Sequence, residues 1–110
     1  MICDAGDVVV VPFPFVDVAA EKRRPSLVLS RLAFNEAHGH CICAMITTAA
    51  RSAWPSDIAI ADRAAAGLSR SCVVLWKLFT LPNAIILRRT GALSEQDRDK
   101  VFAAARTILL

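Results

Sequence analysis

The residues of this chain best suited to chemistry are an arginine and a pair of threonines. Arg24 ends the only run of three basic residues in the sequence and is followed by Pro25. A proline ring excludes helical backbone for the residue before it, so Arg24 is held extended. A guanidinium fixed in this way can pair two oxygens of a phosphate at once. The sequence therefore predicts a phosphate site at Arg24.

Two short apolar runs flank the basic segment. Residues 8–11 and 27–29 are bounded by Gly, Pro and Asp, which is typical of buried strands rather than helices. Phe13 and Phe15 continue one face of the first strand, because side chains two residues apart in a strand point the same way. We therefore expect a strand, a loop and a second strand, with Arg24 at the start of the second.

Topology brings the two threonines to the same place. Residues 41–48 have the pattern of a third strand, and residues 31–40 connect it to the second. A connection of this length favours antiparallel neighbours. The start of one strand then meets the end of the other, so we expect Arg24 to lie beside Thr47 and Thr48.

Several short segments of the chain occur in a recognisable order. They are Gly6-Asp7-Val8-Val9, Arg23-Arg24-Pro25-Ser26-Leu27-Val28-Leu29-Ser30, Ile46-Thr47-Thr48, Lys77-Leu78-Phe79-Thr80-Leu81 and Gly91-Ala92-Leu93-Ser94. Their order and spacing resemble the MazF/PemK family of toxin endoribonucleases from bacterial toxin-antitoxin modules. The resemblance is closest to the PemK-like branch and covers nearly the whole chain.

The resemblance implies a fold. Members of this family have a small SH3-like, partly open barrel of antiparallel strands with a C-terminal helix, a fold shared with the CcdB gyrase poisons. A chain of 110 residues is large enough for one core, so we expect a single MazF/PemK-like domain over residues 1–110. The class is mainly β with a C-terminal α-helix. The helix is predicted from Ser94 onward, with an apolar stripe at Val101, Phe102, Ala105, Ile108 and Leu109.

The remaining segments predict smaller elements. Residues 56–60 and 72–76 read as strands, the latter followed by residues 77–81, and residues 62–71 as a loop with one helical turn. Residues 82–83 read as a turn, and residues 85–87 as a short strand.

The resemblance also implies a reaction. RNA is cleaved without a metal when its own 2′-hydroxyl attacks the adjacent phosphate, provided that the protein aligns the attack and stabilises the charge on the phosphoryl oxygens. In the MazF-like family the residues matching Arg24 and Thr47 are regarded as catalytic. Arg24 suits charge stabilisation, and Thr47 can donate a hydrogen bond to the phosphate or orient the attacking hydroxyl.

Residues around this pair are expected to bind single-stranded RNA. Ten of the thirteen basic residues are arginine and the formal charge is +3, which favours an anionic partner. We assign Lys22, Arg23 and Arg51 to the RNA backbone, with Thr48 beside them, on a surface able to bind RNA and DNA. Trp54 has two interpretations, a platform that stacks a base or a cap on the core edge against Pro55.

Composition suggests where the protein works and in what state. The hydrophobic fraction of 55% is high for so small a domain and is consistent with a homodimer. The N-terminus lacks a basic region followed by an apolar core, and no apolar run approaches the roughly 18 residues of a membrane span. We therefore expect a cytoplasmic protein with reduced cysteines and no membrane contact.

The segment His38-Gly39-His40-Cys41-Ile42-Cys43 contains the residue types of a zinc site. Its spacing matches no familiar structural zinc pattern, and Cys41 and Cys43 fall on one face of the third strand as core residues. The histidines lie about 20 Å along that strand from Thr47, too far to act as its acid and base. We expect no metal and no cofactor.

Three functional readings remain open. The first is a sequence-selective endoribonuclease toxin whose RNA-binding groove is covered by an antitoxin. The second is a non-enzymatic, CcdB-like inhibitor of a protein such as gyrase, although those inhibitors use a C-terminal tryptophan and this chain ends in Leu110. The third is an inactive barrel that binds RNA or protein. The loop at residues 18–23 and the pair Ala49-Ala50 depart from the pattern of the family, which often has a polar amide after the threonines.

Overall fold

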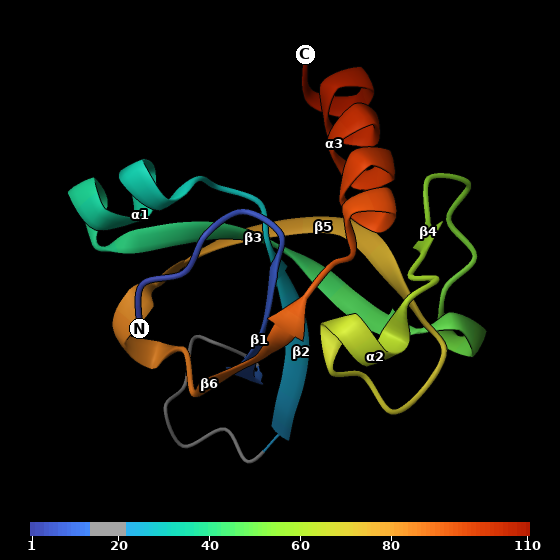
Figure 1. Ribbon diagram of the computed structural model, residues 1–110, viewed down its shortest axis with the longest axis horizontal. Helices are drawn as coiled ribbons and strands as arrows, with labels where there is room; N and C mark the ends of the chain where they lie inside the picture. The colour runs from blue at the N-terminus through green and yellow to red at the C-terminus, as the bar shows by residue number, and fades with distance from the viewer. Residues whose placement is uncertain (14–21) are drawn as a thin grey trace.

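The computed structural model describes residues 1–13 and 22–110 of the chain (Figure 1). The expectations for Phe15 and for the part of the departing loop before Lys22 lie outside the described residues.

The described residues form one curled, half-barrel sheet of six antiparallel strands with a helix at the C-terminus, which confirms the predicted fold class (Figure 1). The strand order is β4-β5-β3-β2-β1-β6. The strands are β1 (Asp7–Phe13), β2 (Lys22–Val28), β3 (His40–Thr48), β4 (Ile58–Ala59), β5 (Cys72–Pro82) and β6 (Arg88–Ala92). The helices are α1 (Leu32–His38), α2 (Arg63–Ala66) and α3 (Glu95–Leu109), and the 3-10 turns are η1 (Ala49–Arg51) and η2 (Asn83–Ile85).

Both faces of the sheet are buried, each by its own apolar cluster. One cluster, on what we call the helix face, joins Val8 and Leu27 to Val101 of α3. The other, on the opposite face, contains Val9 and Val28. Consecutive residues of one strand thus enter different clusters, as the alternation of side chains in a strand requires. A slip of one residue would exchange the two sets, so the register is strongly specified.

Helix α3 begins where the sequence predicts. The Ser94 hydroxyl accepts a hydrogen bond from the Asp97 amide at 3.2 Å, which caps the first turn. Asp97 is itself buried and accepts hydrogen bonds from the Ala61 and Asp62 amides, at 3.2 and 2.9 Å, tying the helix to the segment after β4. No helix of the described residues has both the length and the apolar character needed to cross a membrane.

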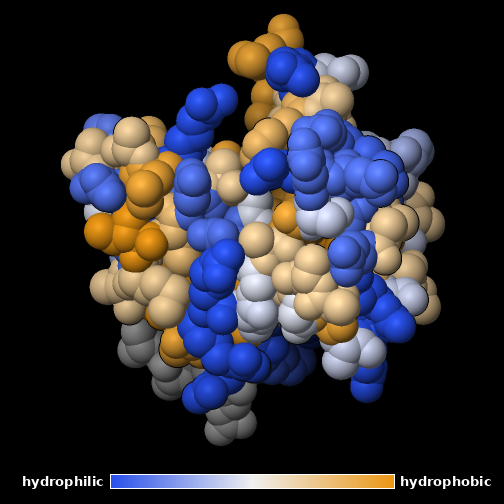
Figure 2. All heavy atoms as spheres, viewed as in Figure 1, coloured by the Kyte–Doolittle hydropathy of each residue, from blue (hydrophilic) through white to orange (hydrophobic). Residues whose placement is uncertain are grey.

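The apolar stripe of α3 packs against the core from Val101 to Ala105 but not at the last turn. Val101 is buried, whereas Ile108 and Leu109 are 45% and 54% exposed. Figure 2 shows apolar atoms at the tip of α3, beyond the body of the domain.

The connections differ from the expectations at two places. Residues 31–40, predicted only as the connection between two strands, contain helix α1, and its first amide, on Leu32, donates to the Asp4 carboxylate at 2.9 Å. Residues 85–87 are not a strand, because Asn83 starts a 3-10 turn there and strand β6 begins only at Arg88. The Asn83 side-chain amide donates to the Asn35 carbonyl at 2.8 Å, which holds this turn against α1.

Helix α2 joins the two edges of the sheet. It follows the edge strand β4 in the chain and packs its backbone on the other edge strand, β6. A Cβ on Gly91 would stand 2.2 Å from the Ala65 carbonyl oxygen, and a Cβ on Gly67 equally close to the Thr90 carbonyl oxygen. The backbones of α2 and β6 are so close that both positions require glycine. This contact between the two edges of the sheet draws it into its half-barrel.

Gly91→Ala is therefore expected to lower the free energy of unfolding by at least about 2 kcal/mol, because the new methyl group forces two backbones apart. The matched control is Gly39→Ala, which has open space around its Cβ and costs only the left-handed conformation, about 1–2 kcal/mol. Urea unfolding followed by circular dichroism measures both. A smaller loss for Gly91→Ala than for Gly39→Ala would contradict the steric account.

Candidate active site

The register of β2 and β3 sets Arg24 opposite Thr47. The paired residues are Ser26 with Met45, Leu27 with Ala44 and Val28 with Cys43, so the predicted antiparallel pairing is confirmed. Continuing this register by two residues along both strands places Arg24 across from Thr47. Residues directly opposite in an antiparallel pair share a face, so both side chains belong to the face opposite α3.

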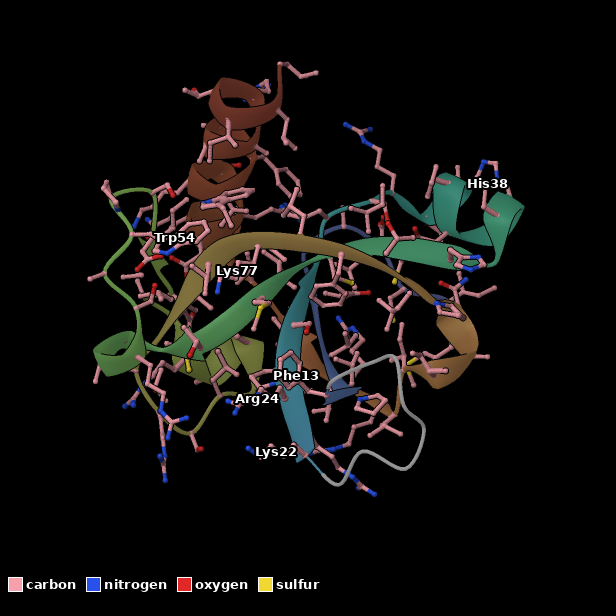
Figure 3. The ribbon with its side chains drawn as sticks, turned by 180° about the vertical axis from the view of Figure 1, so that it is seen from behind. Phe13, Lys22, Arg24, His38, Trp54 and Lys77 are labelled. Carbon is pink, nitrogen blue, oxygen red and sulfur yellow. The ribbon has the colours of Figure 1, made fainter. Side chains whose placement is uncertain are left out.

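The Arg24 guanidinium is held by an aromatic ring. Its central carbon lies 5.4 Å from the centroid of the Phe13 ring, within the range of a cation–π contact (Figure 3). Strand pairing explains this, since Val11 is paired with Arg24 and Phe13 lies one step further along the same face. The ring fixes the plane of the guanidinium before any ligand arrives.

One donor of Arg24 has no protein acceptor. Its Nε is buried, and within the described residues it makes no hydrogen bond. Buried donors are almost always satisfied in folded proteins, and an unsatisfied one costs about 1–3 kcal/mol. Such a donor on a half-buried cation is suited to an anion that binds from outside.

Thr47 is half-buried in an apolar frame. Val73 is its partner on β5, and Val11 is the partner of Arg24 on β1, so a row across the sheet places the two polar residues between two valines. Val11 and Val73 are both buried. Apolar flanks exclude water from the row and strengthen electrostatic interactions within it.

The other predicted binding residues lie at strand ends near this row, but Thr48 is on the helix face, because its partner Cys72 belongs to the helix-face cluster. Lys22 and Arg23 are exposed at the start of β2, Thr48 is half-buried at the end of β3, and Arg51 is exposed at the end of η1. Among the described residues, none of these cations forms an ion pair with a carboxylate. The positive charge of the site is thus uncompensated there, which favours an anionic ligand.

Trp54 is 45% exposed and belongs to neither apolar cluster. The Lys77 ammonium lies over its indole ring, 5.6 Å from the ring centroid (Figure 3). This exposure favours the stacking interpretation over the core cap. Lys77 was missed as a site residue in the sequence, where it stands out only as the one charged residue in the apolar run of β5.

Comparison with known proteins identifies the family. A family model described as PemK-like, MazF-like toxin of type II toxin-antitoxin system matches residues 4–109. The chain belongs to this family. No curated protein sequence matches the chain.

Solved structures show the same fold. A MazE-MazF complex from Deinococcus radiodurans superposes with a TM-score of 0.76 at 19% identity, covering 99% of this chain and 96% of that one. Mycobacterium tuberculosis toxin MazF-mt6 gives 0.73 at 21% identity, covering 94% and 97%. An endoribonuclease in complex with its cognate antitoxin from a mycobacterial species gives 0.74 at 18% identity, covering 98% and 93%.

The histidines of this PemK-like chain lie away from Arg24. His38 ends α1 and His40 begins β3, whereas Thr47 lies near the other end of that strand; Figure 3 shows His38 far from Arg24. The described residues contain no group of three or more histidine, cysteine or acidic side chains arranged to hold a metal.

The cysteines are buried in the core. The Sγ atoms of Cys41 and Cys43 lie 3.6 Å apart, and this contact raises the pKa of Cys43 and lowers that of Cys41. Burial raises the pKa of Cys3 and of Cys72.

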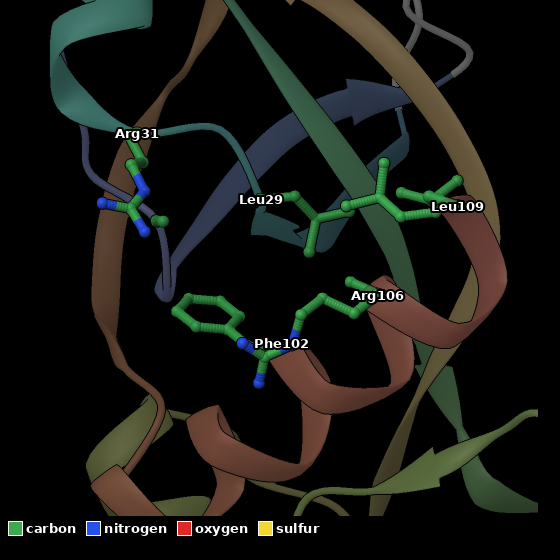
Figure 4. Close-up of a pocket in the computed structure, with 8 residues that line it drawn as sticks. Leu29, Arg31, Phe102, Arg106 and Leu109 are labelled. Carbon is green, nitrogen blue, oxygen red and sulfur yellow. The ribbon is translucent and has the colours of Figure 1, made fainter.

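A groove of about 430 Å³ lies elsewhere in the molecule, between α3 and the segment that follows β2 (Figure 4). None of its lining residues belongs to the Arg24 site. They are Ala5, Leu29, Arg31, Phe102, Ala105, Arg106, Leu109 and Leu110. The candidate site is therefore separate from this groove.

Arg24→Met is expected to raise the free energy of unfolding by about 1 kcal/mol. The change keeps the apolar stem and removes a buried donor that costs about 1–3 kcal/mol, while the lost cation–π contact offsets part of the gain. Arg23→Met, at the exposed neighbouring position, is the control and should change stability by less than about 0.5 kcal/mol. If urea unfolding shows Arg24→Met to be less stable than the wild-type protein, the buried Arg24 donor does not destabilise the fold.

The free energy of unfolding is expected to fall as the pH rises above about 9, in the presence of a reductant. The pKa values of Cys3, Cys43 and Cys72 are raised in the folded chain, so the unfolded thiols lose their protons first. The thiols contribute their full stabilisation below the pKa that they have in the unfolded chain. This stabilisation is lost as the pH rises towards and through their higher pKa in the folded chain. Urea midpoints between neutral pH and pH 10 measure the slope, which should be shallower in Cys72→Ala.

Proposed function

We propose that this toxin is a metal-independent endoribonuclease that cleaves single-stranded RNA at the row formed by Arg24 and Thr47. The observation that carries the proposal is the buried Nε of Arg24, which lacks an acceptor within the described residues and belongs to the residue that the strand register places opposite Thr47. A phosphate placed there supplies the missing acceptor. The guanidinium fork then pairs with its non-bridging oxygens.

The reaction needs few protein groups. The 2′-oxygen forms a bond to phosphorus while the bond from phosphorus to the 5′-oxygen breaks. The proton leaves the 2′-hydroxyl for water and the 5′-oxygen takes one up, giving a cyclic phosphate and a 5′-hydroxyl end. Arg24 stabilises the charge that grows on the phosphoryl oxygens, and Thr47 donates a hydrogen bond to the phosphate or orients the 2′-hydroxyl.

Neither residue is a good proton carrier. A guanidinium stays charged at any physiological pH, and a threonine hydroxyl is a very weak acid. The enzyme therefore works by positioning and by charge stabilisation, and its rate is modest. The apolar frame of Val11 and Val73 supports this role because it keeps the two polar residues away from bulk water.

The surrounding residues hold the strand. Lys22, Arg23 and Arg51 contact phosphates, and Trp54 stacks a base. A base reaches an indole only when it is unstacked, so the substrate is single-stranded. The same surface binds single-stranded DNA without cutting it, because DNA lacks the 2′-hydroxyl.

The partners follow from the family and from composition. We expect a cognate antitoxin that covers the site around Arg24, as solved relatives include a MazE-MazF complex and an endoribonuclease bound to its antitoxin. We also expect a homodimer in the cytoplasm, because 55% of the residues are hydrophobic and Ile108 and Leu109 remain exposed.

The test is cleavage of a long, mostly unstructured RNA by the purified protein in EDTA, with both ends of each product mapped. Discrete cuts that leave cyclic phosphate ends are expected. Arg24→Ala should lower kcat about 10²–10³-fold, the usual loss for one preorganised donor, and Thr47→Ala should also slow cleavage. Arg31→Ala, an exposed arginine of the separate groove, is the matched control and should cut normally.

A folded protein that slows cell growth yet never cuts RNA would refute the proposal and point to a protein target instead. Cleavage that stops in EDTA would equally refute the metal-independent mechanism. Substitution of the nucleotide at the cut by its 2′-deoxy form should abolish cleavage while leaving binding intact.

A further inference from the structure

Strand β5 carries two residues that have no partner on β3. Ala44 is paired with Leu78, but the next residue, Met45, is paired with Leu75, so Trp76 and Lys77 are extra. Such an expansion locally twists a strand and redirects its side chains. Trp76 turns into the core of the helix face, where it is 7% exposed. Lys77 is exposed on the other side.

The extra residue Lys77 meets Trp54. The Lys77 ammonium lies over the indole, 5.6 Å from the ring centroid, and among the described residues it forms no ion pair with a carboxylate. The backbone of Trp54 is fixed by Asp57, whose carboxylate accepts from the Trp54 amide at 3.1 Å and whose amide donates to the Trp54 carbonyl at 3.0 Å. An exposed indole is thus held in place with a cation against one of its faces.

We propose that Trp54 and Lys77 form a nucleotide subsite of their own, separate from the row of Arg24 and Thr47. A base stacks on the indole surface that Lys77 leaves uncovered, and the Lys77 ammonium pairs with a phosphate of the same strand. This inference rests on the proposed function and adds a binding residue to it. The ligand is a single-stranded nucleic acid segment, recognised by its π-face and its charge.

The chemistry of the pair fits both tasks. An indole is the strongest aromatic partner for a cation, so Lys77 is held without losing its charge. The ammonium has three donors, and those that do not point at the ring remain able to bind phosphate oxygens. If Lys77 only shielded Trp54 from water, it would bind no phosphate, and the salt dependence of binding would not include it.

The subsite lies on the same face of the sheet as the proposed catalytic row. Val73 is paired with Thr47, and Val73, Leu75 and Lys77 alternate onto one face of β5. Arg24 and Lys77 are separated by two strand spacings and, because Trp76 and Lys77 have no partner on β3, by only two to three residues along the strands, about 12–14 Å in all. That separation is too great for one nucleotide to span, so the subsite holds a different nucleotide from the one being cut. Loss of Lys77 should therefore raise KM and leave kcat unchanged.

The first experiment measures binding without cleavage. Arg24→Ala protein is titrated with a short, mixed-sequence RNA oligonucleotide and with its DNA counterpart, and tryptophan fluorescence is followed at several salt concentrations. Trp54 is the exposed tryptophan and Trp76 is buried, so quenching that disappears in Trp54→Phe reports the subsite. Trp54→Ala is expected to weaken binding at least about fivefold, whereas Trp54→Phe retains most of the affinity.

Lys77→Ala and Lys77→Met remove the charge and, in the second case, keep the stem. Both are expected to reduce the slope of log affinity against log salt by about 0.7, the value for one phosphate contact of a single strand. The Trp54 variants should leave that slope unchanged. Lys100→Ala, on α3, is the matched control and should match the parent protein in affinity and slope. Far-UV circular dichroism verifies that each variant is folded.

An unchanged slope in both Lys77 variants would overturn the proposal, as would fluorescence that saturating oligonucleotide does not alter. The outcome for the proposed function is separate. Quenching and a Lys77-dependent slope in a wild-type protein that cuts no RNA would support the subsite and refute the enzyme. Cleavage with wild-type KM in the Lys77 variants would support the enzyme and refute the subsite.

Discussion

The pairing of β2 with β3 is the constraint on which the candidate site depends. Leu27 and Val28 are neighbours in the chain but belong to different apolar clusters, so a slip of one residue would place each in the wrong core. The penalty for slipping comes from buried apolar area on both faces of the sheet. Arg24 and Thr47 are therefore brought opposite each other by the two cores.

Because the two cores hold the register, the residues of the site can make locally unfavourable interactions without unfolding the domain. Arg24 keeps a buried donor without an acceptor, and positive side chains gather around it without carboxylates among the described residues. A site preorganised for a phosphate is expected to have these defects, because the groups that will bind the ligand must not bind each other. The two cores and the close contact of α2 with β6 supply the stability that the site gives up.

The sequence could predict those parts of the structure that depend on local signals. Apolar runs located β1, β2 and β3, the short connection set their antiparallel order, and Ser94 marked the start of α3. Helix α1 was not predicted because its stability depends on residues distant in the sequence. Its first amide is capped by Asp4, far back in the chain, and the buried Asn35 side-chain amide donates to the Cys3 carbonyl at 2.8 Å. Lys77 was not predicted as a site residue for the same reason, since only the register of β3 against β5 turns it towards Trp54.

The chemistry of the row also limits what it can recognise. In the proposed function, Arg24 and Thr47 contact phosphate and the 2′-hydroxyl, which every ribonucleotide carries, and contacts to the backbone hold no sequence information. Stacking on Trp54 tolerates every base, because each has a π-face. Choice among bases must therefore come from groups that reach base edges outside this set. Ala49 and Ala50 are exposed directly after the threonines and offer only methyl groups to a base. In the proposed function, cleavage at the row and selection of the cut site are thus separable properties of one surface.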